Sequence, residues 1–193
     1  MHVVWYTAMS IDGRIAGPGD DVSFLDTVQG DGDEHDFDDF VAGIDALVVG
    51  SGSLRWLHAQ GHDLPHRGVP IWLVSHDEEL AARAASADPD GTPVVRCEGD
   101  VAVILDEIGA AGHERVWICG GGDIAGQALA ADRVDEVILT VAPTVLGAGP
   151  AIFDYPSLEP RRFALAECRE YGKGSVRLRW LRATAPASGL TAG

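Results

Sequence analysis

Three consecutive glycines, Gly120, Gly121 and Gly122, carry the clearest chemical signal, because they join an apolar run to a helical pattern that opens Asp123-Ile124. Glycine allows the backbone to turn sharply and to approach a ligand, and the free N–H groups at the start of a helix attract phosphate oxygens. The pattern predicts a loop that binds a pyrophosphate. A tight turn that binds nothing is the alternative, and the carboxylate of Asp123 would repel a phosphate unless it points away.

An acidic stretch at residues 31–39 offers a candidate proton donor. Reduction of a C=N bond places a hydride on carbon and a proton on nitrogen, and a carboxylic acid in a dry pocket can supply that proton. Asp36 shares a helical face with Phe40, whose side chain we expect to point inward. We therefore predict that Asp36 is the catalytic acid, against the alternative that the acidic stretch is a solvated helix face.

His58, His62 and His66 recur every four residues, a spacing that on one continuous helix could form a metal-binding face. Gly61 and Pro65 interrupt such a helix, so we interpret the three histidines as loop residues and predict no metal site. The three cysteines lack a C-x-x-C spacing, which favours reduced, buried thiols over a disulfide framework or a zinc ribbon.

A sheet has to position these groups, and the sequence alternates between strand-like and helix-like segments in the order typical of an α/β protein. Six apolar runs bounded by Gly, Pro or Asp predict buried, mostly parallel strands at residues 3–8, 46–50, 70–75, 93–97, 116–119 and 134–142. Helical patterns lie between them at residues 36–44, 53–60, 77–87, 101–111 and 123–131.

The alternation ends after Pro150. Residues 163–171 and 175–182 are separated by Gly172-Lys173-Gly174, which predicts an antiparallel hairpin at one edge of the sheet. Residues 183–193 are small and polar, and we expect a disordered tail there. The sequence thus predicts one α/β domain over residues 1–182.

Composition limits the classes of function. With 193 residues, 46% of them hydrophobic, the chain is long enough to bury one core and too short for two large ones. The formal net charge of −16 argues against nucleic-acid binding, which depends on clustered Lys and Arg. The first residues lack the pattern of a signal peptide, and no apolar run reaches membrane-spanning length. We therefore expect a cytoplasmic protein that acts on a small molecule.

Four segments, in the same order along the chain, resemble the reductase (C-terminal) domain of bacterial riboflavin biosynthesis and its dihydrofolate-reductase-like relatives. They are residues 9–17, 45–50, 120–125 and 139–149. The resemblance spans residues 1–182, and the order of the segments is more specific than any one motif. It implies a dihydrofolate-reductase-like α/β fold with a mainly parallel eight-stranded sheet and flanking helices. It also implies an NADPH-dependent oxidoreductase that passes a hydride to a small pterin-like, pyrimidine-like or imine substrate.

The same resemblance implies roles for matching residues at the reacting end of the site. Backbone groups of Ala8, Ile15 and Ala16 would receive the nicotinamide carboxamide. Residues 10–13 resemble a mobile loop over the active site. Thr140 matches a threonine that helps to orient the substrate ring in the folate enzymes.

The rest of the cofactor would be held by three further groups of residues. The start of a helix would contact the cofactor phosphates, through Gly50, Ser51, Gly52 and Ser53. The glycine loop, residues 120–124, would bind the pyrophosphate. Ser75 and His76 would bind the phosphate of the adenosine ribose.

One departure from the family concerns that ribose phosphate. Family members usually carry Gly-Arg-x-Thr where this chain has Gly50-Ser51-Gly52-Ser53, so the arginine fork that normally binds the extra phosphate of NADPH is missing. If Arg55, Ser75 and His76 together replace it, NADPH should bind more tightly than NADH. NADH stays open as the alternative cofactor.

Two further expectations concern the whole molecule. The rival to a reductase is a non-catalytic nucleotide- or ligand-binding protein on the same scaffold. The exposed hairpin at residues 163–182, together with the resemblance to dimeric relatives, predicts a homodimer. The zinc-deaminase signature, His-x-Glu followed by Pro-Cys-x-x-Cys, is missing from the sequence, so we expect a free-standing reductase.

Overall fold

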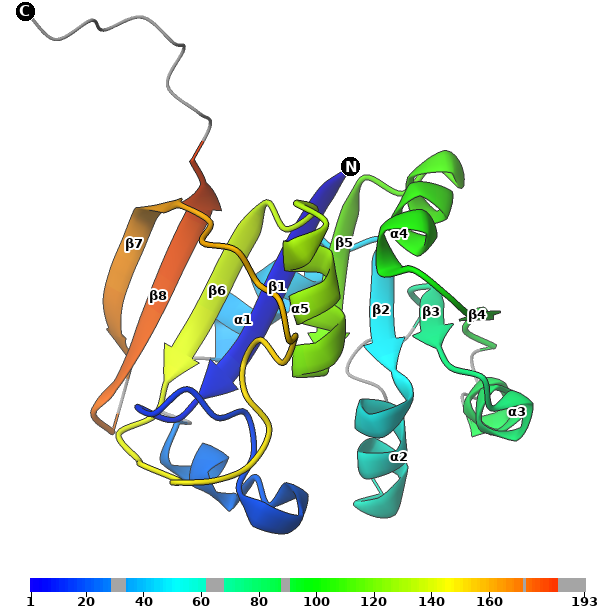
Figure 1. Cartoon of the computed structure of the whole chain (residues 1–193). Coiled ribbons are helices and arrows are strands. Elements are labelled where there is room, and N and C mark those ends of the chain that lie inside the picture. Colours follow the sequence, from blue (N-terminus) through cyan, green and yellow to red (C-terminus); the bar gives the residue numbers. More distant parts are fainter. Residues whose placement is uncertain (29–33, 62–67, 88–90, 172, 184–193) are drawn as a thin grey trace, which may run out of the picture.

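Strands and helices alternate along most of the chain in the computed structural model, which describes residues 1–28, 34–61, 68–87, 91–171 and 173–183 (Figure 1). The strands are β1 (His2–Met9), β2 (Ala46–Gly50), β3 (Ile71–Val74), β4 (Val94–Cys97), β5 (Arg115–Gly120), β6 (Glu136–Val141), β7 (Phe163–Tyr171) and β8 (Ser175–Arg182). The helices are α1 (Glu34–Ala42), α2 (Ser51–Ala59), α3 (Glu78–Ala87), α4 (Val101–Ala110) and α5 (Gly122–Ala130). Two short 3-10 helices, η1 (Pro18–Asp20) and η2 (Ser23–Thr27), lie between β1 and α1.

The strands form one eight-stranded sheet in the order β4-β3-β2-β5-β1-β6-β8-β7. Strands β1 to β6 run parallel, while β8 pairs antiparallel with β6 and β7 pairs antiparallel with β8. The first strand of the chain is therefore a central strand, with β5 on one side and β6 on the other. This arrangement confirms the predicted mainly parallel sheet with a C-terminal hairpin.

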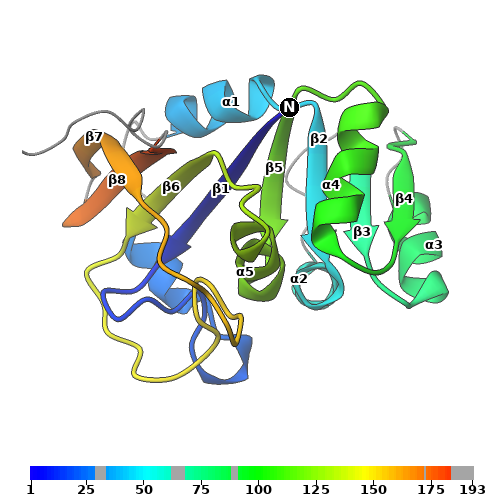
Figure 2. The same ribbon diagram turned by 45° about the horizontal axis from the view of Figure 1, so that its top comes forward.

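Helices cover both faces of the sheet, because side chains alternate along each strand between two apolar cores. Val3 and Trp5 of β1 belong to the core that α4 and α5 cover. Val4 and Tyr6 belong to the opposite core, to which α1, α2 and α3 contribute Phe40, Leu54 and Leu80 among others. The two layers of helices can be followed in Figure 2.

Two sequence interpretations need correction. Cys168 is exposed, so the expectation of a buried thiol is wrong for this residue, because it lies on β7, an edge strand on which few side chains are covered. His58 lies in α2 rather than in a loop, since the helix continues as far as Ala59. His62 and His66, and residues 184–193 of the predicted tail, lie outside the described residues. Within the described helices, none has the length and apolar character that a membrane span requires.

Candidate active site

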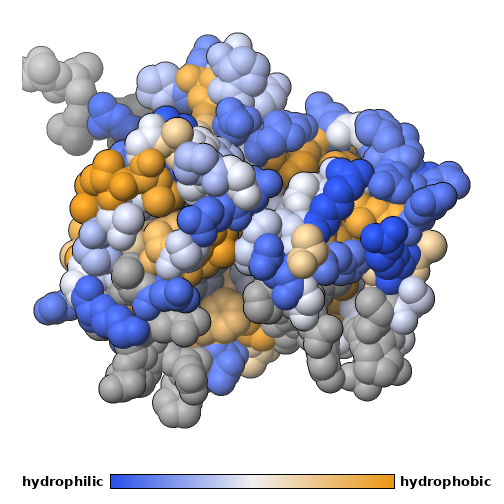
Figure 3. Space-filling model, turned by 90° about the horizontal axis from the view of Figure 1, so that it is seen from below, coloured by the Kyte–Doolittle hydropathy of each residue, from blue (hydrophilic) through white to orange (hydrophobic). Residues whose placement is uncertain are grey.

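The carboxyl ends of the parallel strands meet at one edge of the sheet, and a pocket of about 770 Å³ opens along it from β1 to β4. Figure 3 views the molecule from the side of this edge. Ligand sites in open α/β sheets occur at the carboxyl ends of strands, in pockets of this size. Thirteen of the fifteen predicted cofactor residues line the pocket, and the two that do not are Ala8 and Arg55.

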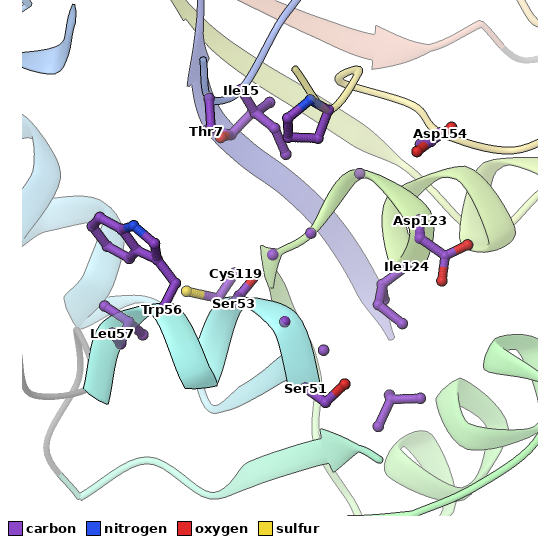
Figure 4. A pocket seen from close by; sticks show the side chains of 18 of the residues that line it. Thr7, Ile15, Ser51, Ser53, Trp56, Leu57, Cys119, Asp123, Ile124 and Asp154 are labelled. Atoms are coloured by element: carbon purple, nitrogen blue, oxygen red, sulfur yellow. The ribbon is translucent and has the colours of Figure 1, made fainter. Parts of the chain in front are cut away.

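Two helices begin at the middle of this pocket. α2 starts directly after β2 with Gly50 as its N-cap, and α5 starts directly after β5 with Gly121 as its N-cap. Neither N-cap carries a side chain that bonds the first turn, so no side-chain cap competes with a ligand for the first N–H groups. Both positive helix ends face the same space, which suits a diphosphate. Figure 4 shows α2 and α5 on either side of the glycine loop.

The glycines of the loop serve two different purposes. A Cβ atom on Gly122 would overlap the carbonyl oxygen of Ala151, so this glycine is required for backbone packing. A Cβ on Gly121 would meet only the Ser53 hydroxyl, at 3.4 Å, and one on Gly52 would meet nothing within 4 Å. Gly121 and Gly52 therefore leave room on the pocket side, where a ligand can approach the backbone.

Apolar and hydroxyl side chains surround the end of the pocket next to β1. Thr7 and Ile15 lie on one side of the glycine loop, and Trp56 and Leu57 of α2 lie on the other (Figure 4). The indole N–H of Trp56 donates to the carbonyl oxygen of Asp20 at 3.0 Å, which ties α2 to the segment that follows β1. This end can receive a flat ring.

Residues 10–13, which the sequence predicts as a mobile loop, are tied to a second loop. The Asp12 carboxylate accepts hydrogen bonds from the Ser10 hydroxyl at 2.6 Å and from the backbone N–H groups of Leu146 and Gly147 at 3.0 and 2.8 Å. These bonds, first that of Ser10, lower the pKa of Asp12 to about 2. Arg14 adds a bond from its guanidinium to the carbonyl oxygen of Gly149. Next to these bonds, the backbone N–H of Ile15 donates to the carbonyl oxygen of Pro150 at 3.0 Å, and both residues line the pocket.

A buried polar cluster lies at the carboxyl ends of β1 and β6, close to the predicted substrate-orienting residue. The Tyr6 hydroxyl is hydrogen-bonded to Thr140, Tyr171 and Arg177. Thr140 is 3% exposed and faces Arg177 across the β6–β8 pair. Burial raises the pKa of Tyr6 despite these partners, so the phenol keeps its proton at neutral pH. Thr140 does not line the pocket itself, although Trp117, which packs on Tyr6, does.

The other candidate groups are the acid Asp36, the cation Arg55, the Cys119 thiol and possible metal ligands. Asp36 lies in α1, but its side chain is outside the described part of the structure. Arg55 points its guanidinium at Asp77, at 2.9 Å, and not into the pocket. Burial raises the pKa of Cys119, a lining residue, to about 12, so its thiol is not a nucleophile at neutral pH. No group of three potential metal ligands occurs among the described residues.

Several residues of the site were not predicted from the sequence. Tyr6, Tyr171 and Arg177 come together only through the pairing of β8 with β6, and no local motif signals that register. Glu98 and Asp154 also line the pocket. Glu98 directly follows β4, so the rule that ligand sites lie after parallel strands could have found it.

Comparison with known proteins identifies relatives of this chain. Protein YwjB of Bacillus subtilis (strain 168), called uncharacterized, is 26% identical over 191 residues, which cover 93% of this chain and 97% of YwjB. A solved structure from Shewanella sp. PV-4, named for riboflavin biosynthesis, shares the fold with a TM-score of 0.83 at 21% identity over 95% of this chain and 100% of that one.

A second solved structure is the diaminohydroxyphosphoribosylaminopyrimidine deaminase/5-amino-6-(5-phosphoribosylamino)uracil reductase of Thermotoga maritima. It shares the fold with a TM-score of 0.75 at 16% identity, over 94% of this chain and 56% of that one. The model of the family described as "RibD C-terminal domain" matches residues 1–177. This chain therefore belongs to the RibD C-terminal domain family.

Proposed function

We propose that this chain is a reductase that binds NADPH or NADH and passes a hydride to a small pterin-like, pyrimidine-like or imine substrate. The observation that carries the proposal is the pair of helix N-termini, α2 and α5, that open without side-chain caps on one pocket. Two positive helix ends side by side favour a pyrophosphate. Membership of the family and the reductase named in the Thermotoga structure support the reaction class.

The residues present fit a dinucleotide. Gly121 and Gly52 leave the backbone accessible at the phosphates, and the hydroxyls of Ser51 and Ser53 lie beside them (Figure 4). The nicotinamide ring would be held at the apolar end, next to Ile15. A dinucleotide held by these residues would supply the hydride for the substrate carbon. The chain then has to exclude water and to hold the substrate ring and its proton source.

Thr140 remains our proposal for a residue that positions the substrate ring, and we add Tyr6; both lie behind Trp117, which lines the pocket. Their hydroxyls are hydrogen-bonded to each other and are held in place by Arg177. The indole N–H of Trp117 donates to the backbone carbonyl oxygen of Tyr6 at 3.1 Å, so the cluster can fix the pocket wall against which the substrate ring would lie. Asp36 remains our prediction for the carboxylic acid that supplies the proton from the α1 side.

The proposal is tested in two steps with the purified protein. Titration with NADPH and with NADH measures binding, and the absorbance of the reduced nicotinamide then reports turnover with a panel of a dihydropterin, an aminopyrimidine and a cyclic imine. We expect binding of at least one dinucleotide and oxidation with at least one substrate class. Binding without oxidation across the panel would favour the rival, a ligand-binding protein, and no binding of either dinucleotide would contradict the proposal.

The homodimer predicted from the sequence also remains a proposal. The outer side of β7 has no partner strand in the described sheet, and Leu165 on β7 is 58% exposed. An unpaired edge strand that exposes a large apolar side chain is a surface through which two copies can pair. We expect sedimentation at micromolar concentration to give the mass of a dimer and Leu165→Lys to shift it toward the monomer. A monomeric wild-type protein would contradict this.

A further inference from the structure

The charge of the pocket is unusual for a site that binds a phosphate-rich ligand. The described lining residues include four carboxylates but no lysine or arginine, the carboxylates being Asp20, Glu98, Asp123 and Asp154. The two helix N-termini can balance the charge of one pyrophosphate. A ligand that carries a further phosphate would have to place it among like charges.

That further phosphate would fall at the end of the pocket next to β3 and β4. On the proposed function, the glycine loop holds the pyrophosphate and the Ile15 end holds nicotinamide. The adenosine ribose is then left with Ser75, His76, Glu98 and Gly99. NADPH differs from NADH only by the phosphate on the 2′ oxygen of this ribose, so these residues decide between the two cofactors.

Both described arginines near this end are already engaged by carboxylates. Arg55 donates to Asp77 at 2.9 Å. Arg96 pairs with Glu98 and, at 3.2 Å, with Glu78. Neither guanidinium lines the pocket. A 2′-phosphate would therefore compete with existing ion pairs for any arginine that it could reach.

Glu98 is the charged group that a ribose would meet here. Its Oε2 atom lies 2.9 Å from Nδ1 of His76, and its other oxygen pairs with Arg96. The bonds from His76 and Arg96 hold the pKa of Glu98 below its usual range, so the carboxylate is charged at neutral pH. A carboxylate can accept hydrogen bonds from ribose hydroxyls, whereas it repels a phosphate monoester, which carries about −1.5 to −2 charges at pH 7.

We propose that this pocket selects NADH over NADPH and that Glu98 determines the preference. The inference rests on the proposed function, because it takes a nicotinamide dinucleotide as the ligand. It reverses the order of affinities expected if Arg55, Ser75 and His76 replaced the family arginine. The reason is that Arg55 is bound to Asp77 and His76 is bound to Glu98.

The test compares the dissociation constants of NADH and NADPH for three proteins by calorimetric titration at neutral pH and low salt. They are the wild type, Glu98→Gln and Glu170→Gln. The last variant removes the same charge at the edge strand β7, far from β4 in the sheet order, and serves as the matched control. The side chain of Glu98 is 44% exposed, so water screens part of its charge.

We expect the wild type and Glu170→Gln to bind NADH about tenfold more tightly than NADPH. In Glu98→Gln the ratio should narrow to about threefold or less, through a gain in NADPH affinity. NADPH binding as tightly as NADH to the wild type would overturn the inference and leave the proposed reductase in place. If the ratio of the two dissociation constants is unchanged in Glu98→Gln, Glu98 does not determine the preference. Binding of neither dinucleotide would contradict the proposed function itself.

Discussion

Gly121 and Gly122 are neighbours in the sequence, yet substitutions at the two residues should have different consequences. Gly121→Asp places a side chain and a negative charge in the open space of the pocket, so we expect loss of dinucleotide binding by about a hundredfold or more with little change in melting temperature. Gly43→Asp, at the opposite end of β2, is the matched control because its Cβ has only ordinary contacts. Titration with the dinucleotide measures the loss of binding, and thermal unfolding measures the melting temperature.

Gly122→Ala should act on the fold instead. Its Cβ would overlap the carbonyl oxygen of Ala151, and overpacking of this kind costs about 1–3 kcal/mol of stability. Wild-type affinity in Gly121→Asp would show that the phosphate loop lies elsewhere, whatever Gly122→Ala does.

Tyr6→Phe removes one hydroxyl from the polar cluster that includes Thr140 and Arg177. We expect kcat to fall about tenfold, because the pocket wall beside the substrate ring loses a bond that positions it, while the dissociation constant of the dinucleotide stays unchanged. Tyr155→Phe, at a 38% exposed tyrosine, is the control. Steady-state kinetics and a binding titration separate the two effects, and a fall in dinucleotide affinity alone would place Tyr6 at the cofactor.

At the scale of elements, the Asp12 carboxylate joins the loop after β1 to the loop after β6. Asp12→Asn should weaken dinucleotide binding severalfold, because an amide offers one acceptor oxygen where the carboxylate offers two. Hydrogen exchange at Leu146 and Gly147 should become faster. Asp26→Asn is the control, because Asp26 is an exposed aspartate of η2 and belongs to neither loop. Unaltered exchange at both amides would show that the carboxylate does not hold the loops together.

The pH dependence of this link follows from the sign of the pKa shift. The folded pKa of Asp12 is lowered to about 2 from an ordinary value of 3.8. The contribution of the charged Asp12 carboxylate to the stability of the folded loops is therefore fully present above pH 3.8 and is lost as the pH falls through 2. Dinucleotide affinity should show no step from this group between about pH 5 and 9.

Local elements were predictable to a greater extent than their arrangement. Each expected strand and helix is present with ends within two residues of the prediction, because Gly, Pro and Asp mark the boundaries of clear apolar runs. Periodicity could not predict that β1 lies between β5 and β6; only the family resemblance implied the overall arrangement. The polar cluster around Tyr6 was missed for the same reason, since it depends on register between strands far apart in the sequence.

At the scale of the whole molecule, one buried carboxylate connects several strands. Glu136 of β6 is 1% exposed and bonds to His2 of β1 and Arg179 of β8, with Arg115 of β5 at 3.6 Å. Glu136→Gln removes the carboxylate charge that Arg115 and Arg179 share and that His2 contacts. We expect the free energy of unfolding to fall by about 3 kcal/mol, measured by denaturant titration at pH 7. Glu114→Gln, at an exposed position just before β5, is the control.

Lowering the pH should reduce the free energy of unfolding in the same way as Glu136→Gln. Burial opposes ionisation of Glu136, but the bonds from Arg179 and His2 outweigh it and hold the pKa of Glu136 below its usual value of 4.5. The stabilisation is thus present above pH 4.5 and is lost as the pH falls below it. The wild type and Glu136→Gln should therefore become closer in stability as the pH is lowered from 5 toward 3, and a constant difference would contradict the assignment.

The central place of β1 has a consequence for the chain during its synthesis. β1 leaves the ribosome before the other strands of this sheet, yet its two neighbours begin only at Arg115 and Glu136. Strands β2, β3 and β4 can pair as they emerge, while Trp5 and Tyr6 have no strand beside them until β5 appears. Until β5 has emerged, the nascent chain therefore presents an apolar strand with free backbone groups, the kind of segment that chaperones bind and that associates with other chains.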